Sequence, residues 1–545
     1  MIDKELHYRR VLILFGILLF IFAGLFVRLL IIQLAHYPKY SKLAAVQRQG
    51  SLLKNTLKGS FFDRHGLLIR GSSEAWYLLI EKTVPTRGKM ICDRLRPIMA
   101  ENFEKSYDQN KSQSFWIFPI PLNNSQIVQI RALRFSECKI VAATARQDQY
   151  QGIAWHILGL NDKERGLSGL EHLYQKFLQG AGNNGSIFTL NDGEKGYFPG
   201  LGLRSQSNPN LSGVVLTIDA KIQQIVEQVM VSHGVTGAIV ILDAQTGQIL
   251  AMCSRPQVGS LDRDAMEKHP YLNRAISAYH PGSIFKLVAL SAGLDSGLLS
   301  PDDYFEDRGF YRIGDKLWRC TTSKGGHGVI SLKEALAYSC NPIFIQVALR
   351  LRPQLILDYA DRFGLGQPAN IGLRDESWGK LPSGIGFSDG DIANLVLGQQ
   401  DVYTTPLQIA SLIQTIANDG VRCVPQLVLG TVLKKGAAFK PLIPKPMERV
   451  IKSETAGMIR DMMTAVVTFG TGKLAQLPGG AAGKTGTAQV NDEADAPSHA
   501  WFGGYTPINH PKYVGVIFCE QGISGAETAA PLFKEVMEKV TRIED

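Results

Sequence analysis

The sequence predicts an α+β fold for most of the chain, with one membrane-spanning helix ahead of it. Strand-like runs occupy both ends of residues 213–545 and helix-forming runs fill the middle, which favours a sheet assembled from distant segments. A long apolar run near the start indicates the membrane helix. Because 545 residues exceed what one hydrophobic core usually serves, we expect at least two folded regions.

The apolar run begins at Val11. Seventeen consecutive residues up to Val27 lack a polar side chain, and the apolar character resumes after Arg28, so a helix over 11–35 is long enough to cross a bilayer. Basic residues precede it, which predicts a cytoplasmic tail over 1–10 and an exported remainder. The alternative is a cleaved signal peptide. Its apolar region would be shorter and would end in small residues, so we expect the helix to be retained.

Residues 36–212 form the next expected domain, and nothing in them indicates catalysis. Phe61 to Gly66 indicates a strand that ends in a turn. Gly166 to Leu178 has the period of an amphipathic helix. We interpret this region as a pedestal or dimerisation-like domain.

The last expected domain covers residues 213–545. A strand over 214–219 leads into a helix, and 237–252 contains two β-rich runs around a turn, the pattern of a hairpin. Near the far end, 500–505 and 513–519 indicate a second strand pair that a helix follows. The helical runs between the two strand pairs span 285–292, 332–338, 406–417 and 453–467.

Composition argues against several classes of function. The formal charge of +9 is spread along the chain, so nucleic-acid binding is not expected. The seven cysteines are odd in number and never spaced as Cys-x-x-Cys, and the eleven histidines do not cluster with carboxylates at ligand spacing. The sequence therefore indicates neither a zinc site nor a disulfide framework, and we expect chemistry without a metal or a cofactor.

Three short motifs in fixed order indicate an acyl-transfer site: Ser283-Ile-Phe-Lys286, Ser339-Cys-Asn341 and Lys484-Thr-Gly486. Ser-x-x-Lys alone is weak because it occurs four times, whereas Ser-x-Asn and Lys-Thr-Gly each occur once. Ser283 precedes both at intervals of 56 and then 145 residues, which a single domain can fold together. The other three matches begin at Ser51, Ser136 and Ser377.

Ser283 follows the turn pair Pro281-Gly282 and precedes a helix-forming run, so we expect it to open a helix. The free N–H groups there favour negative charge that develops nearby. Lys286 lies almost one turn away on the same face, and a desolvated lysine within hydrogen-bond reach can accept the serine proton. For an isolated Ser-x-x-Lys, the alternative is a helix-capping serine beside a solvated lysine.

The other two motifs supply candidates for a proton relay and for substrate binding. Ser339 can pass a proton between Lys286 and a leaving amine, and Asn341 offers an amide to a substrate backbone. The alternative for this motif is a helix-capping turn. We expect the third motif on an edge strand; its alternative is an exposed turn.

The third motif and the threonine after it suit a substrate with a free carboxylate. Lys484 supplies a positive charge, and Thr485 and Thr487 supply hydroxyl groups. Gly486 would let a substrate approach the backbone closely.

In this order the three motifs are the signature of penicillin-binding proteins and serine β-lactamases, and the wider sequence resembles a class B penicillin-binding protein. Gly398-Gln-Gln400 departs from the Gly-Gln-Gly that the family more often shows. The resemblance implies a serine β-lactamase-like transpeptidase domain, with a central antiparallel sheet and a helical subdomain, behind an elongated pedestal. Its other matches are Asn273-Arg-Ala275, Thr405-Pro-Leu-Gln-Ile-Ala410, Ala500-Trp-Phe-Gly-Gly-Tyr505, Asp63-Arg-His-Gly66 and Gly169-Leu-Glu171.

The resemblance also implies a reaction. Ser283 would be acylated by the D-Ala-D-Ala end of a peptidoglycan stem peptide, with Lys286 as general base, and an amine from a second stem peptide would complete the crosslink. Backbone N–H groups of Ser283 and Thr487 would form the oxyanion hole, and Lys484, with the threonines beside it, would hold the terminal carboxylate. β-Lactam antibiotics would acylate the same serine.

The resemblance further implies a single-pass protein of the bacterial inner membrane, with a periplasmic or extracellular catalytic domain and a multi-span glycosyltransferase as partner. The alternatives are a D-Ala-D-Ala carboxypeptidase, a β-lactamase or penicillin sensor, and a non-catalytic scaffold for a glycosyltransferase. The motifs are shared by division, elongation and sporulation members, so they indicate neither the process nor the acceptor amine.

Overall fold

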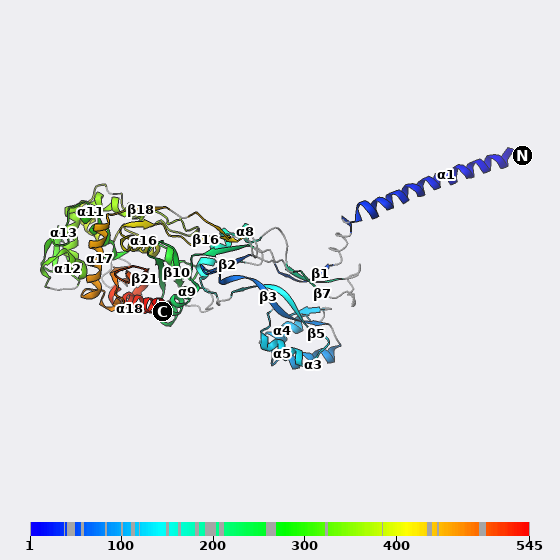
Figure 1. Ribbon diagram of the computed structural model, residues 1–545, viewed down its shortest axis with the longest axis horizontal. Helices are drawn as coiled ribbons and strands as arrows, with labels where there is room; N and C mark the ends of the chain where they lie inside the picture. The colour runs from blue at the N-terminus through cyan, green and yellow to red at the C-terminus, as the bar shows by residue number, and fades with distance from the viewer. Residues whose placement is uncertain are drawn as a thin grey trace. The chain divides into compact units, whose positions relative to one another are not determined.

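The computed structural model is drawn in Figure 1. It describes residues 2–37, 39–40, 49–55, 59–81, 84–99, 102–110, 115–118, 120–148, 152–161, 165–179, 185–190, 203–206, 212–257, 269–321, 325–383, 385–432, 439–443, 446–489 and 498–543.

Two compact units alternate along the chain. The smaller unit comprises Met1–Leu57, Ser73–Ala145 and Gly182–Asn208. The larger unit comprises Lys58–Ser72, Arg146–Ala181 and Pro209–Asp545. The expected domain boundary at residue 212 stays a prediction. In the division into compact units, two segments before this residue, Lys58–Ser72 and Arg146–Ala181, belong to the larger unit.

The smaller unit begins with α1 (Ile2–Leu30) and the π-helical turn η1 (Ile31–Ala35). Among the described helices, His7–Ala35 alone is long and apolar enough to cross a membrane, with a mean hydropathy of 2.7 and none of its surface buried. The remaining elements of this unit are β1 (Gln49–Asn55), the later part of β3 (Leu68–Glu81), α3 (Pro85–Leu95), α4 (Phe103–Asn110), β4 (Phe115–Ile117), α5 (Asn124–Ala132), most of β5 (Cys138–Asp148), β6 (Gly185–Leu190) and β7 (Leu203–Gln206).

The early segments of the larger unit pack around a buried ion pair. Strand β2 (Ser60–Phe62) pairs in parallel with β8 (Gly213–Leu216), which in turn pairs with β16 (Val428–Val432). Arg70 lies 3.7 Å from the buried Glu171 and donates to the Gly159 carbonyl at 2.7 Å. The other elements here are α6 (Trp155–Leu158), α7 (Gly169–Leu173) and α8 (Gln175–Gln179).

The prediction of a single helix over 166–178 is wrong, because the structure has two short helices there, α7 and α8. The chain leaves the helix at Tyr174, whose ψ angle is 13°, and resumes helical geometry at Gln175. The apolar face is nevertheless as expected, because Leu170 and Leu178 are both buried. The strand and turn expected at 61–66 are confirmed.

A five-stranded antiparallel sheet forms the centre of the larger unit, in the order β10-β9-β21-β20-β19. This arrangement confirms the sheet assembled from distant segments. Both expected strand pairs are present. The strands are β9 (Gly237–Asp243), β10 (Ile249–Arg255), β19 (Ala482–Gln489), β20 (Ser498–Thr506) and β21 (Tyr513–Gly522).

Helices bury both faces of this sheet. Ile239 and Ile241 of β9 belong to one core with α9 (Ala220–Ser232) and α18 (Ala530–Thr541), whereas Val240 and its alternate neighbours belong to the other core. Figure 1 shows α9 and α18 near β10 and β21. The helices of the other core are α11 (Lys286–Asp295), α12 (Leu332–Ala337), α13 (Asn341–Leu351), α14 (Pro353–Arg362), α15 (Asp389–Val396), α16 (Pro406–Ala417) and α17 (Ser453–Thr468).

A buried carboxylate anchors the far end of α11. Asp295 accepts hydrogen bonds from Tyr359 Oη at 2.7 Å, Thr455 Oγ1 at 2.9 Å and the Lys452 backbone N–H at 2.8 Å. Burial alone would raise the pKa of Asp295, but these hydrogen bonds hold it below its ordinary value. Helix α11 is therefore tied to α14 and to the start of α17.

Short strand pairs complete the larger unit. They are β11 (Tyr304–Asp307) with β14 (Gly328–Ser331), β12 (Phe310–Ile313) with β13 (Lys316–Arg319), β15 (Val421–Cys423) with β18 (Met447–Arg449), and β16 with β17 (Phe439–Pro441).

Candidate active site

Ser283 lies in a 3-10 turn, η3 (Gly282–Phe285), that leads directly into α11. Gly282 has φ +57°, and a Cβ placed on it would lie 2.6 Å from the Thr487 carbonyl oxygen. A side chain at residue 282 would therefore clash with the backbone of β19. The glycine brings the nucleophile candidate against the strand that carries the third motif, and Ser283 is half-buried there.

Lys286 is completely buried at the first turn of α11. Its Nζ donates to the Ser339 carbonyl and to Asn341 Oδ1, both at 2.7 Å, and lies 3.3 Å from Ser339 Oγ. Among the described residues, no carboxylate lies within ion-pair distance of this amine, and it forms no hydrogen bond with Ser283. Burial lowers the pKa of Lys286 to about 7.

Ser339 lies in the loop between α12 and α13, with φ +55°. This left-handed conformation is uncommon for a residue other than glycine and costs about 1 kcal/mol or more. The hydroxyl oxygen of Ser339 lies 2.8 Å from Lys484 Nζ as well as 3.3 Å from Lys286 Nζ. Two buried amines therefore meet at one serine.

Lys484 lies on β19, at the edge of the five-stranded sheet, so the expected edge-strand position is confirmed. The side chain is completely buried and also donates to the Thr485 carbonyl at 2.9 Å. Burial and the positive charge of Lys286 lower the pKa of Lys484 well below its ordinary value. Its amine points inward to Ser339, not outward to solvent.

The neighbours of Lys484 differ in exposure. Thr485 is buried and lies 2.7 Å from Thr471 through the two hydroxyl oxygens, whereas Thr487 is exposed and accepts from the Gly525 backbone N–H at 3.1 Å. Thr471 was not expected from the sequence, because it belongs to an unremarkable turn after α17.

The expectation that Gly486 leaves space for a substrate needs a correction. A Cβ on Gly486 would lie 2.7 Å from the Pro281 carbonyl oxygen and 3.1 Å from Ile284. The chain's own turn before Ser283 therefore occupies the space beside this glycine. Its role here is to let β19 and η3 pack closely.

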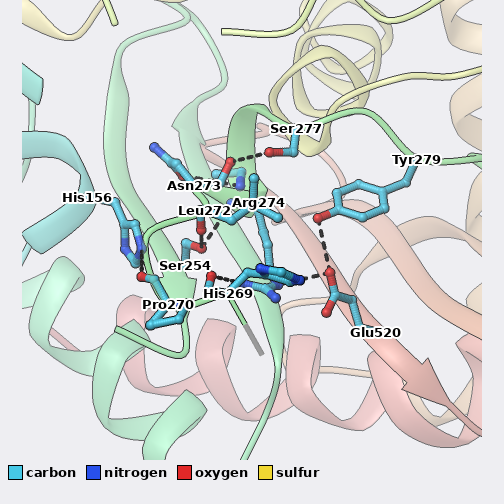
Figure 2. A network of polar contacts seen from close by, with 11 residues as sticks. His156, Ser254, His269, Pro270, Leu272, Asn273, Arg274, Ser277, Tyr279 and Glu520 are labelled. Carbon is cyan, nitrogen blue, oxygen red and sulfur yellow. Dashed lines mark hydrogen bonds and ion pairs between the residues drawn. The ribbon is translucent and has the colours of Figure 1, made fainter. Parts of the chain in front are cut away.

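A second polar network, missed by the sequence reasoning, supports the segment that leads into Ser283 (Figure 2). Arg274 is 2% exposed, and its Nε lies 2.9 Å from Glu520 Oε1 on β21. Tyr279 Oη donates to the same carboxylate oxygen at 3.0 Å, and the Tyr279 backbone exchanges two hydrogen bonds with Thr404. The sequence signal for this network was Asn273-Arg-Ala275, but the sequence did not show that Arg274 would contact Glu520.

Known proteins are similar to this chain in sequence and in fold. Penicillin-binding protein PbpB of Mycolicibacterium smegmatis is 34% identical over 424 residues, which cover 72% of this chain and 64% of that protein. Peptidoglycan D,D-transpeptidase MrdA of Haemophilus influenzae is 26% identical, with 98% of this chain and 92% of that protein covered. The match thus spans less than two thirds of PbpB and nearly all of MrdA.

A solved structure and a family model agree with these relatives. Penicillin-binding protein 3 of Mycobacterium tuberculosis, crystallised with aztreonam, superposes with a TM-score of 0.65 at 27% identity, covering 90% of this chain and 97% of that one. The model of the penicillin-binding protein transpeptidase domain matches residues 237–538, which contain all three motifs. This chain is a class B penicillin-binding protein. The α+β fold expected for that family is confirmed.

The ion pair of the buried Arg274 with the half-buried Glu520 predicts that this penicillin-binding protein is sensitive to substitution of Glu520. Glu520→Ala would leave a buried guanidinium without its carboxylate and free the Tyr279 hydroxyl, so we expect a loss of about 3 kcal/mol in unfolding free energy. Urea denaturation of the wild type and the variant measures this difference. The exposed Glu448→Ala is the matched control and should change stability by about 0.5 kcal/mol or less. Equal effects of the two substitutions would contradict the assignment.

Proposed function

We propose that this chain is a peptidoglycan D,D-transpeptidase that works through an acyl-enzyme on Ser283, and that β-lactams acylate the same serine. The observation that carries the proposal is the meeting of Lys286 and Lys484 at Ser339, beside the turn that presents Ser283. Acyl transfer needs a nucleophile, a base and a proton donor for the leaving amine. This arrangement supplies one candidate for each.

Lys286 is suited to act as the base. A neutral lysine has two N–H donors and one lone pair, and the two donors have acceptors at the Ser339 carbonyl and Asn341 Oδ1. The contact of Nζ with Ser339 Oγ, at 3.3 Å, is the longest of its three, so we assign the lone pair of the neutral amine to the proton of Ser283. Because the pKa of Lys286 is about 7, a large fraction of the amine is neutral at physiological pH.

We propose an acylation step that begins at Ser283. Ser283 Oγ attacks the carbonyl carbon of the penultimate D-Ala while Lys286 takes the hydroxyl proton. The tetrahedral oxyanion is stabilised by the backbone N–H groups of Ser283 and Thr487. The C–N bond breaks, the terminal D-Ala leaves as an amine after receiving a proton, and an ester with Ser283 remains.

Ser339 is suited to carry the proton to the leaving amine. Its oxygen faces Lys484 Nζ and Lys286 Nζ, so its own O–H is free to point toward a third group. Asn341 Oδ1 holds Lys286, and its amide N–H₂ offers a donor to the substrate backbone. In the second half-reaction a stem-peptide amine attacks the ester, and the same groups transfer protons in reverse.

The terminal carboxylate is assigned to Lys484, Thr485 and Thr487, and Gly486 is left with its packing role. Thr487 is the exposed member of this set and offers its hydroxyl directly. Since Lys484 is buried, we propose that it acts on the site electrostatically through Ser339, in addition to any direct contact that it makes with a bound substrate.

We further propose a setting for this reaction. Helix α1 would cross the inner membrane with the amino terminus in the cytoplasm, and the catalytic unit would lie in the periplasm or outside the cell. The residues between the helix and the catalytic unit would serve as a pedestal. A multi-span glycosyltransferase would supply the glycan strands, because no motif for glycan polymerisation was recognised in this chain.

Covalent labelling tests the nucleophile. Ser283→Ala should abolish the adduct with a fluorescent penicillin, because the ester cannot form without Oγ. Ser377→Ala is the matched control, since it removes the serine of another Ser-x-x-Lys and should label like the wild type. Full labelling of Ser283→Ala would show that another residue is the nucleophile.

Product analysis tests the acceptor. With a labelled stem peptide and an amine acceptor, we expect a crosslinked dimer that chromatography and mass spectrometry detect. Free acid as the sole product would instead identify a carboxypeptidase. Rapid hydrolysis of the penicillin adduct would identify a β-lactamase, and absence of both adduct and product would favour the scaffold.

The pH dependence of acylation tests the base. Only the neutral amine accepts a proton, so the second-order rate of penicillin acylation should rise with pH, roughly tenfold per unit at low pH, and level off above an inflection near 7. Stopped-flow fluorescence measures this rate. A rate that does not change across neutrality would remove Lys286 from the role of base.

A further inference from the structure

Four side chains with metal-ligating atoms meet beside the second motif: Asp307, Cys320, His327 and Cys340. One ligand atom from each lies within 4.8 Å of every other, and His327 alone is not fully buried. Asp307 ends β11, Cys320 follows β13, His327 precedes β14 and Cys340 precedes α13. Each donor comes from a different element, so the cluster has no ligand spacing in the sequence, where none was expected, and it forms only in the folded chain.

One donor pair already lies at the distance expected around a tetrahedral ion, and a second lies closer. Thiolate, imidazole and carboxylate ligands about 2.0 to 2.3 Å from zinc lie about 3.3 to 3.8 Å from one another in a tetrahedron. Cys320 Sγ and His327 Nδ1 are 3.6 Å apart. Asp307 Oδ2 and His327 Nδ1 are 2.7 Å apart as a hydrogen-bonded pair, so this pair would open by roughly half an ångström on metal binding.

Contacts around the cluster orient its donors. Asp307 Oδ1 accepts from the Gly309 backbone N–H at 2.8 Å, which leaves Oδ2 directed at His327. The His327 ring stacks on Tyr338 with centroids 4.9 Å apart and planes within 3°. Such outer contacts hold ligands in place in metal sites.

We propose that Asp307, Cys320, His327 and Cys340 bind one zinc ion. Two sulfurs, one imidazole and one carboxylate in a tetrahedral arrangement favour zinc over calcium or magnesium, which prefer oxygen ligands. Binding converts the two thiols to thiolates and releases their protons to solvent. The site is structural, because all four positions around the ion are filled by the protein.

The ion would act on the active site through Cys340. This residue separates Ser339 from Asn341, and both of those contact Lys286. A bond from zinc to Cys340 would tie this loop to three strand ends and help to hold Ser339 in its left-handed conformation. Zinc binding itself does not depend on the proposed transpeptidase reaction, so the two proposals can fail separately.

Metal titration of the full chain in detergent tests the site. After reduction and treatment with a chelator, the protein should take up one Zn²⁺ per chain in competition with a chromogenic chelator. Co²⁺ should give thiolate charge-transfer bands and the visible bands of a tetrahedral site. Zn²⁺ should also raise the thermal midpoint of the wild type.

Variants locate the ion. Cys320→Ser and His327→Gln should each weaken Zn²⁺ binding by more than about tenfold, since even residues outside the ligand set have effects of that size. Cys253→Ser is the matched control, because it removes a buried thiol outside the cluster and should bind like the wild type.

Three results would overturn the proposal. They are a reduced wild type that binds neither metal, a Cys320→Ser variant that binds Zn²⁺ like the wild type, and a Cys320–Cys340 disulfide found by mass spectrometry in the protein isolated from its membrane. The wild-type stoichiometry decides the matter even if a variant fails to fold.

Discussion

The burial of two lysine amines around one serine hydroxyl constrains the rest of the active site. Lys286 and Lys484 are both completely buried, and the described residues place no carboxylate beside either. Burying an ammonium ion costs several kcal/mol unless its charge is paired, so at least one of these amines is favoured in the neutral form. The three motifs therefore act as one unit: burial lowers the pKa of both amines, and the charge of Lys286 lowers the pKa of Lys484 further.

Close backbone packing maintains this arrangement. Gly282 lies against Thr487, Gly486 lies against the Pro281 carbonyl, and a Cβ on Gly398 would lie 2.3 Å from the Gly282 carbonyl oxygen. Three glycines thus join the serine turn, the edge strand and the loop after α15. The same loop contains Gln400, whose φ is +56°. Glycine adopts that conformation without strain, whereas a glutamine such as Gln400 is strained there.

Much of the fold followed from the sequence because its signals are local. The period of apolar residues predicted α16 over the same residues that form it, and the turn between β9 and β10 predicted their hairpin. Motif order predicted which of the four Ser-x-x-Lys serines lies beside β19, the strand that carries Lys484. The hydrogen bonds of Lys286, the neighbour of Gly486 and the four-donor cluster were not predictable, since each depends on tertiary packing between segments distant in the chain.

The order of segments in the larger unit bears on how the chain reaches its folded state. Strand β2 pairs with β8 across about 150 residues of sequence, and β9 pairs with β21 across more than 250. Contacts of such long range form slowly, because the intervening chain must first be ordered. The central sheet cannot close until β21 is available to pair with β9. Until then the apolar strand β9 has one edge unpaired, so this is the stage of folding at which the protein most needs protection from aggregation.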